Sequence, residues 1–168
     1  MSAVPVKLLA SGQTEVRKFP SGPELTGQQM VKAALALTAD WEFDVVSIGF
    51  PSLVVDGRPH LEPFSLSHGG VGYDFAAHLG RPVKIINDAA MQALASYEGC
   101  RMLFLGLGTG LGSTLIVGKR IIPLDLGQLP FRDRNLNDYL SRAAFKSRGR
   151  GDRFDCPQQF PNCHGRFP

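Results

Sequence analysis

A chain of 168 residues, 43% hydrophobic and 20% charged, has the length and composition of one globular domain. Its formal net charge is +3, but from position 141 onward six Lys or Arg residues stand against two acids, so residues 1–140 are nearly neutral. A neutral body argues against nucleic acid as the main partner, and the lack of an 18-residue apolar run argues against a membrane span.

The cysteines and the first residues bear on the cellular compartment. Three cysteines, an odd count, form no disulfide framework. The segment Met1–Lys7 lacks the charged region and apolar core of a signal peptide. We therefore expect a reduced, cytoplasmic setting.

The first half of the chain alternates short strands with helices. We predict strands over Val6–Ala10 and Thr14–Phe19, and then a helix from Thr26 to about Asp40. Thr26 can cap this helix with Gln29 completing a capping box, and the pattern places Met30, Ala34 and Leu37 on one face. A buried strand over Asp44–Phe50 follows, and then a short helix over Tyr73–Leu79 that ends at Gly80.

The second half continues this pattern and adds a hairpin. The predicted elements are a strand over Pro82–Ile86, a helix over Ala89–Tyr97 and a strand over Met102–Leu107. The segments Thr114–Val117 and Arg120–Ile122 flank Gly118-Lys119, a natural two-residue hairpin turn. Alternating strands and helices with an added hairpin predict an α/β fold with a mixed sheet.

The composition changes near Leu140. Residues 141–168 contain no Leu, Ile, Val or Met, although they contain four Phe. Such a segment cannot bury enough aliphatic surface to offset its ordering entropy, which predicts a disordered or poorly packed tail. Two explanations stay open at this point, an ordinary polar tail and translation outside the proper reading frame.

Asn87-Asp88 is the first candidate for chemistry. The pair follows the apolar Ile85-Ile86 and precedes a predicted helix, at the carboxyl end of a strand expected to be parallel. Open α/β sheets place their ligand crevices at such ends. A helix N-cap is the simpler role for Asp88, and the two roles are compatible.

The second candidate is a run of four glycines at alternate positions from Gly106 to Gly112, with Thr109 among them. Backbone N–H groups without side chains around them can hold phosphate oxygens. The run is neither a P-loop nor a dinucleotide fingerprint, because Leu111 stands where the latter needs glycine. A glycine-rich hairpin turn that binds nothing is the alternative.

Two further groups of polar residues give weaker signals. Asp125 and Gln128 lie among apolar residues just after the hairpin, where they could pair with the hydroxyls of a ligand or complete a turn. Cys156, Cys163 and His164 lack a fourth ligand and a Cys-x-x-Cys pair, so we expect no metal site.

Taken together, these motifs resemble the ROK sugar kinases, and among them the bacterial glucokinases and polyphosphate glucokinases. The resemblance runs from about Lys7 to Tyr139 in order and spacing. The motifs that carry it are Asn87-Asp88-Ala89, the Gly108-Thr109-Gly110-Leu111-Gly112 run, Asp125-Leu126-Gly127-Gln128 in place of Glu-x-Gly-His, and Ile48-Gly49-Phe50-Pro51-Ser52.

This resemblance implies the actin-like, ribonuclease H-like ATPase fold and transfer of phosphoryl from ATP or polyphosphate to the 6-hydroxyl of glucose. It implies that Asp88 is the general base, that Asn87, Asp125 and Gln128 bind the sugar, and that Mg²⁺ accompanies the donor. The family's phosphate motif would be Gly108, Thr109, Gly110 and Gly112. The resemblance also implies that the protein binds glucose or a similar hexose and forms a homodimer.

The chain departs from the family pattern in several places. The Asp-x-Gly-Gly-Thr turn with which the family begins is absent, Asp125 stands for Glu, and Gln128 stands for His. Residues 141–168 do not resemble the family's second half. We therefore expect a copy shortened at both ends, with residues 1–140 as the kinase N-terminal region and impaired catalysis. The alternative is a non-catalytic sugar-binding remnant or interaction protein.

Overall fold

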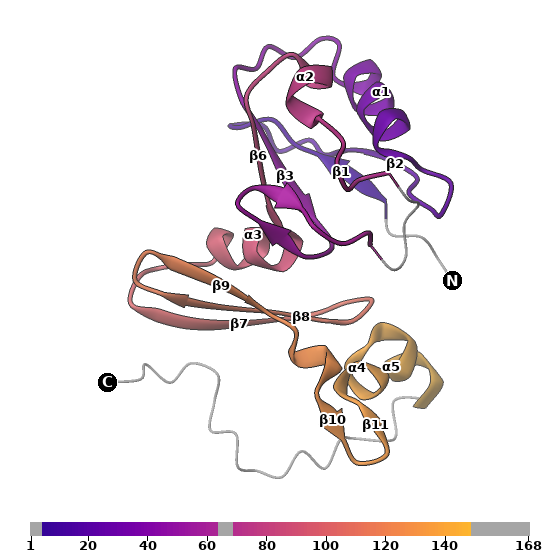
Figure 1. Cartoon of the computed structure of the whole chain (residues 1–168), viewed down its shortest axis with the longest axis vertical. Helices are drawn as coiled ribbons and strands as arrows, with labels where there is room; N and C mark the ends of the chain where they lie inside the picture. The colour runs from indigo at the N-terminus through magenta and orange to yellow at the C-terminus, as the bar shows by residue number, and fades with distance from the viewer. Residues whose placement is uncertain (1–4, 64–68, 149–168) are drawn as a thin grey trace. The chain divides into compact units, whose positions relative to one another are not determined.

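The computed structural model describes residues 5–63 and 69–148 (Figure 1). The chain divides into two compact units, Met1–Asp88 and Ala89–Pro168. The first contains parallel and antiparallel strands, and the second an antiparallel sheet, which confirms the predicted mixed α/β fold. No helix in the described ranges is long and apolar enough to cross a membrane.

The first unit is built from three strand pairs. Strands β1 (Val6–Leu8) and β2 (Arg17–Phe19) pair antiparallel, as do the short β4 (Val54–Val55) and β5 (Arg58–Pro59). Strands β3 (Val46–Phe50) and β6 (Val83–Asn87) pair in parallel, as predicted. Their register places Phe50 opposite Asn87, so both strands end at the same edge.

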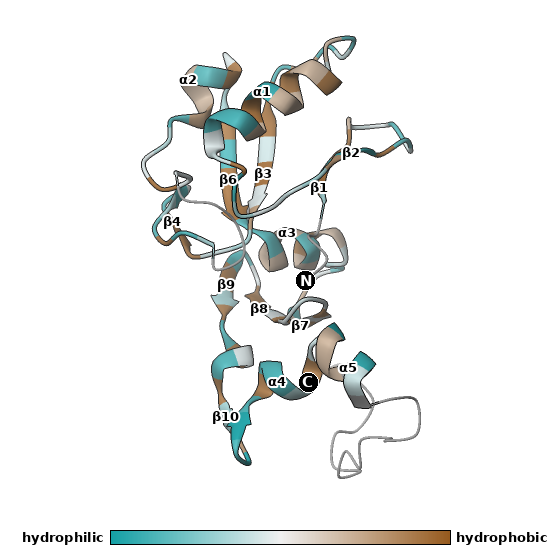
Figure 2. Cartoon of the chain, turned by 90° about the vertical axis from the view of Figure 1, so that its right-hand side faces the viewer, coloured by the Kyte–Doolittle hydropathy of each residue, from teal (hydrophilic) through white to brown (hydrophobic). Residues whose placement is uncertain are grey.

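Two helices of the first unit supply its core together with β3 and β6. They are α1 (Gly27–Leu37) and α2 (Phe75–Leu79), and the apolar stretches of α1, β3 and β6 are visible in Figure 2. Buried side chains from all four elements form one cluster, which consists of Val31, Phe50, Phe75 and Ile85. Burial of this apolar surface is the main contribution to the stability of the unit.

The ends of both helices follow the sequence closely. Thr26 Oγ1 accepts the Gln29 N–H, and Gln29 Oε1 accepts the Thr26 N–H, which is the predicted capping box. Helix α2 ends at Gly80 with φ 63°, a left-handed conformation that favours glycine. The face predicted for α1 is only partly buried, because Met30 and Ala34 are half-buried and Leu37 is exposed, while Val31 is the buried apolar residue.

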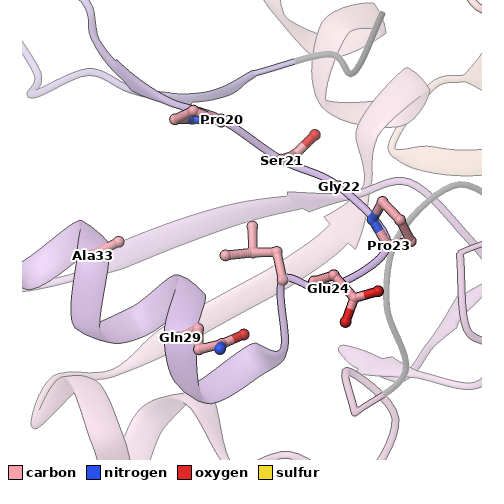
Figure 3. A pocket seen from close by; sticks show the side chains of 8 residues that line it. Pro20, Ser21, Gly22, Pro23, Glu24, Gln29 and Ala33 are labelled. Carbon is pink, nitrogen blue, oxygen red and sulfur yellow. The ribbon is translucent and has the colours of Figure 1, made fainter. Parts of the chain in front are cut away.

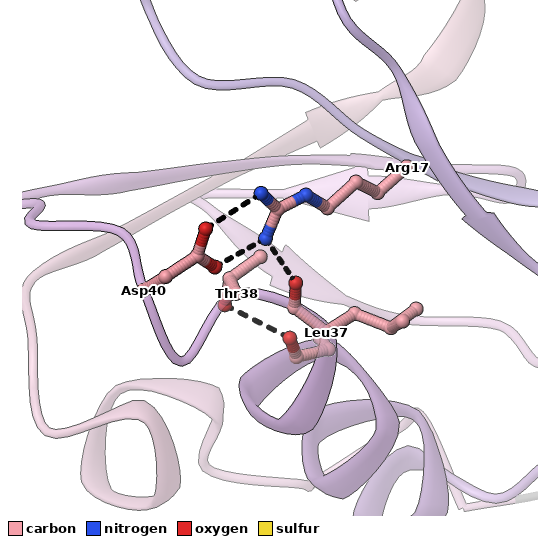
Figure 4. A network of polar contacts seen from close by, with 5 residues as sticks. Arg17, Leu37, Thr38 and Asp40 are labelled. Atoms are coloured by element: carbon pink, nitrogen blue, oxygen red, sulfur yellow. Dashed lines mark hydrogen bonds and ion pairs between the residues drawn. The ribbon is translucent and has the colours of Figure 1, made fainter.

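Arg17 ties β2 to the end of α1 (Figure 4). Its guanidinium donates to both carboxylate oxygens of Asp40 and to the Leu37 carbonyl, and it lies 4.6 Å from the Trp41 ring centroid. The bidentate pairing holds the pKa of Asp40 at about 2.

The second unit contains a three-stranded antiparallel meander. Its strands are β7 (Arg101–Leu107), β8 (Leu111–Val117) and β9 (Arg120–Leu124), in the order β7-β8-β9. The predicted turn at Gly118-Lys119 joins β8 and β9, with Gly118 at φ 59°. Helix α3 (Asp88–Ala95) begins at the boundary of the units and buries Ala89, Ala90 and Ala93.

Short elements complete the described part of this unit. They are the 3₁₀ helix η1 (Leu126–Gln128), the hairpin β10 (Pro130–Phe131) and β11 (Arg134–Asn135), and helices α4 (Leu136–Leu140) and α5 (Arg142–Arg148). Within the segment expected to be a tail, residues 142–148 therefore form a helix. Residues 149–168, with Cys156, Cys163 and His164, lie outside the described residues.

Candidate functional site

Asn87 and Asp88 lie where the parallel strand β6 gives way directly to α3. Asn87 is the last residue of β6, and Asp88 is the first residue of the helix. Both side chains are half-buried. A carboxylate in the first turn of a helix is stabilised by the unpaired N–H groups and the helix dipole. The predicted position at the carboxyl end of a parallel strand is thus observed.

The turn after β3 lies beside Asn87. The Asn87 Nδ2 donates to the Ser52 carbonyl over 3.2 Å, so the amide links the carboxyl end of β6 to the Pro51-Ser52 turn. The structure therefore brings together two motifs that lie 35 residues apart in the sequence. This contact fixes the orientation of the Asn87 amide.

A carboxylate holds the next loop of this unit. Glu62 accepts the backbone N–H groups of Gly69, Gly70 and Val71 over 2.9, 3.2 and 3.0 Å. A Cβ on Gly70 would lie 2.8 Å from Phe50 Cζ, so only glycine permits this close approach. Glu62 thus orders the chain before α2.

The glycine run of the second unit divides into two parts with different roles. Gly106 and Gly112 lie opposite each other in β7 and β8, and a Cβ on Gly112 would lie 3.1 Å from the Ala89 Cβ of α3. Close packing therefore accounts for Gly112. Gly108, Thr109 and Gly110 form the turn between the two strands, which we call the glycine turn.

The backbone of the glycine turn is fixed at its base and open at its tip. The Gly108 N–H donates to the Gly110 carbonyl over 2.9 Å, and the Gly108 carbonyl accepts the Arg142 N–H over 2.8 Å. Within the described part of the chain the N–H groups of Thr109 and Gly110 make no hydrogen bond, and a Cβ at Gly108 would meet no atom within 4 Å. Open N–H groups of this kind suit phosphate oxygens.

Asp125 and Gln128 lie at the two ends of a second turn, residues 125–128, which we call the Asp125 turn. Asp125 precedes η1, its side chain does not cap that helix, and both side chains are exposed. Gln128 Oε1 accepts a hydrogen bond from Asn135 Nδ2 over 3.2 Å. The carboxylate and the amide therefore remain accessible to a polar ligand.

Two residues that were not predicted from the sequence hold the segments next to these turns. The Ser113 hydroxyl is buried, donates to the Leu124 carbonyl and accepts the Leu126 N–H, each over 3.1 Å. Asn137 Oδ1, from α4, accepts the Leu111 N–H over 2.7 Å. Neither contact has a local sequence signal, because each joins residues at least 11 positions apart.

No group of three His, Cys, Asp or Glu side chains gathers in the described ranges. Mg²⁺ is commonly bound through substrate phosphates, water and one or two carboxylates, so this does not conflict with an Mg²⁺ that arrives with a phosphoryl donor.

Two hollows on the first unit lie away from the predicted site residues. A groove of about 460 Å³ runs along the segment between β2 and α1, lined by Pro20, Gly22, Pro23 and Gln29 among others (Figure 3). A smaller one of about 250 Å³ adjoins Arg17 and Trp41. Neither contains Asn87 or Asp88.

Solved structures of sugar kinases are similar to the chain. No protein-family model matches the chain. It is similar to the inorganic polyphosphate/ATP-glucomannokinase from Arthrobacter sp. strain KM (25% identity, TM-score 0.64, 81% of this chain). It is also similar to a ROK family glucokinase from Streptomyces griseus in complex with glucose and AMPPNP (21% identity, TM-score 0.60, 77% of this chain). The chain has the fold of the ROK-family sugar kinases.

The sequence comparison agrees with this fold. The chain is 31% identical over 119 residues to the bifunctional enzyme NanE/NanK of Brucella melitensis, an alignment that spans 63% of this chain. The chain spans only part of these relatives: it covers 23% of the Brucella protein, 61% of the Arthrobacter kinase and 50% of the Streptomyces kinase. The predicted actin-like ATPase fold is thereby confirmed for the part of the fold that the chain spans.

Proposed function

We propose that the chain is part of a hexose kinase that transfers a phosphoryl group to the 6-hydroxyl of glucose or a similar hexose, and that its own turnover is impaired. The observation that carries the proposal is the position of Asn87-Asp88, at the carboxyl end of a parallel strand in a ROK-type fold. The open backbone of the glycine turn supports it.

In the proposed reaction the Asp88 carboxylate accepts the proton of the hexose 6-hydroxyl. The freed oxygen attacks the terminal phosphorus of the donor, and the bond from that phosphorus to the bridging oxygen breaks. The leaving group is ADP when the donor is ATP, or a shortened chain when the donor is polyphosphate. Such transfer depends mainly on positioning and on stabilisation of the phosphate charge.

The remaining residues bind and orient the reactants. Asn87, held by Ser52, would donate to a sugar hydroxyl, and Asp125 and Gln128 would pair with ring hydroxyls. The N–H groups of Thr109 and Gly110 would donate to phosphate oxygens, with Gly108 leaving the approach open. Mg²⁺ bound to the donor would neutralise part of its charge.

The first prediction concerns Asp88→Asn. Loss of a general base lowers the rate by about 10²–10⁴-fold, so we expect glucose 6-phosphate formation to fall by at least about 100-fold. Glucose binding should change by about threefold or less, because asparagine keeps the shape and the polar contacts of the side chain. A coupled assay with Mg·ATP or polyphosphate gives the rate, and calorimetric titration gives the affinity.

Asp74→Asn is the matched control, because Asp74 also stands at the start of a helix and its side chain accepts the Ala77 N–H. Asparagine caps helices as well as aspartate, so this variant should retain full activity. Equal turnover in wild type and Asp88→Asn would exclude Asp88 as the base. Glucose binding without any product from the wild type would instead favour a non-catalytic sugar-binding protein.

A further inference from the structure

The side chain of Asn137 is inserted between the glycine turn and the Asp125 turn. Its Oδ1 accepts the Leu111 N–H over 2.7 Å, directly after the glycine turn. The same side chain lies against the backbone of Gly110 and of Gly127. One amide therefore contacts both turns, although Gly110 and Gly127 are 17 positions apart in the sequence.

Two glycines owe their identity to this contact. Neither Gly110 nor Gly127 has a positive φ, so backbone freedom does not require glycine at either position. A Cβ on Gly127 would lie 2.6 Å from Asn137 Cγ, and a Cβ on Gly110 would lie 3.0 Å from Asn137 Oδ1. Asn137 thus occupies the space that side chains at both turns would need.

Asn137 is itself firmly held by its surroundings. It lies in the first turn of α4, whose start is fixed by a capping box between Asn135 and Asp138. The N–H of Leu136 donates to the Leu129 carbonyl, just beyond the Asp125 turn. The side chain is half-buried, so its rotamer freedom is reduced and its hydrogen bond is partly shielded from water.

We propose that Asn137 is a positioning residue that sets the spacing between the glycine turn and the Asp125 turn. This inference rests on the proposed function, because the spacing affects turnover only if one turn holds phosphate and the other holds the sugar. Phosphoryl transfer is sensitive to such spacing, and a misplacement of about 1 Å can cost about 100-fold in rate.

Hydrogen exchange at the Leu111 amide tests the contact without any need for activity. Asn137→Ala removes the acceptor, and a hydrogen bond of ordinary strength corresponds to about a five- to tenfold faster exchange. Asn137→Asp keeps an acceptor oxygen and should restore slow exchange. Asp138→Ala is the matched control, because it weakens α4 through its cap but leaves the Leu111 acceptor in place.

A double variant tests the close approach. Gly127→Ala should lower the melting temperature because its Cβ meets Asn137, and adding Asn137→Ala should recover most of that loss. Equal exchange at Leu111 in Asn137→Ala and Asp138→Ala, or the absence of recovery in the double variant, would overturn the inference.

Kinetics separate positioning from general stability. We expect Asn137→Ala to lower kcat by about tenfold or more, with KM for glucose within about threefold and with rescue by Asn137→Asp. Equal kcat losses in Asn137→Ala and Asp138→Ala would overturn the positioning role. If the wild-type chain forms no glucose 6-phosphate, the proposed function fails, while Leu111 exchange and the double variant still decide whether Asn137 holds the two turns.

Discussion

At the scale of single residues, Thr114 is buried without a hydrogen-bond partner for its hydroxyl. It lies in the central strand β8 with no exposed surface, and among the described residues nothing pairs with its Oγ1. A buried polar group that has lost its water contacts and gained no partner destabilises the folded state. Valine has nearly the same shape and favours strands equally well.

We therefore predict that Thr114→Val raises the free energy of unfolding by about 1 kcal/mol. Thr38→Val is the control, because Thr38 is also buried but its hydroxyl donates to the Ala34 carbonyl over 2.9 Å. The free energy of unfolding of Thr38→Val should equal that of the wild type or be lower. Urea unfolding of both variants gives the comparison, and a Thr114→Val that is less stable than Thr38→Val would contradict the prediction.

Single residues also mark how far the sequence can predict the site. The positions of Asn87 and Asp88 can be predicted from the sequence because an apolar strand passes directly into a helix at this pair. Asn137 and Ser113 cannot, because their roles depend on partners brought close only by the fold. The glycine run shows the same limit, because the sequence does not reveal that its glycines differ in their surroundings. Gly112 packs against Ala89, whereas Gly108 and Gly110 lie in the turn.

At the scale of elements, local signals predicted most strands and helices. The capping box of α1 and the Gly118 turn are both present, because each depends on residues within one turn. The hairpin at Asp56-Gly57 was not predicted, although Asp-Gly is a known turn signal and both residues have positive φ. The β10–β11 hairpin turns at Arg132-Asp133, a pair without such a signal.

The contact between β2 and the end of α1 predicts a dependence of stability on acid. Arg17 hydrogen bonds lower the pKa of Asp40 from 3.8 to about 2. A carboxyl group with a lower pKa in the folded state stabilises the fold above its unfolded pKa. This contribution is therefore complete above about pH 5 and is lost as pH falls from about 4 toward 2.

We predict that Asp40→Asn removes this part of the acid dependence. Thermal unfolding of wild type and variant should differ most near neutral pH and converge as pH falls below about 3. Because Asp40 is exposed, the difference should also shrink at 1 M salt, where charges are screened within about 3 Å. A difference that persists unchanged at pH 2 would show that the ion pair is not its source.

At the scale of the whole molecule, the first unit has a buried apolar cluster, and the second unit exposes an apolar sheet face. Alternation along β7 places Leu103, Leu105 and Leu107 on one face, with exposed fractions of 51%, 46% and 67%. The register of β8 and β9 adds Leu115 and Ile122 to that face. Contiguous apolar surface of this kind favours association or binding to apolar dyes.

The double variant Leu103→Thr/Leu105→Thr tests this face. We expect it to lower the fluorescence of the dye ANS and any concentration-dependent association, while the free energy of unfolding changes by about 0.5 kcal/mol or less per site. Threonine keeps the strand propensity, so only the apolar surface is removed. Ile116→Thr, on the buried face of β8, is the control and should cost about 2 kcal/mol or more while raising ANS fluorescence. Equal losses of stability in the two variants would contradict the prediction. They would mean that Leu103 and Leu105 are buried in the folded protein in solution.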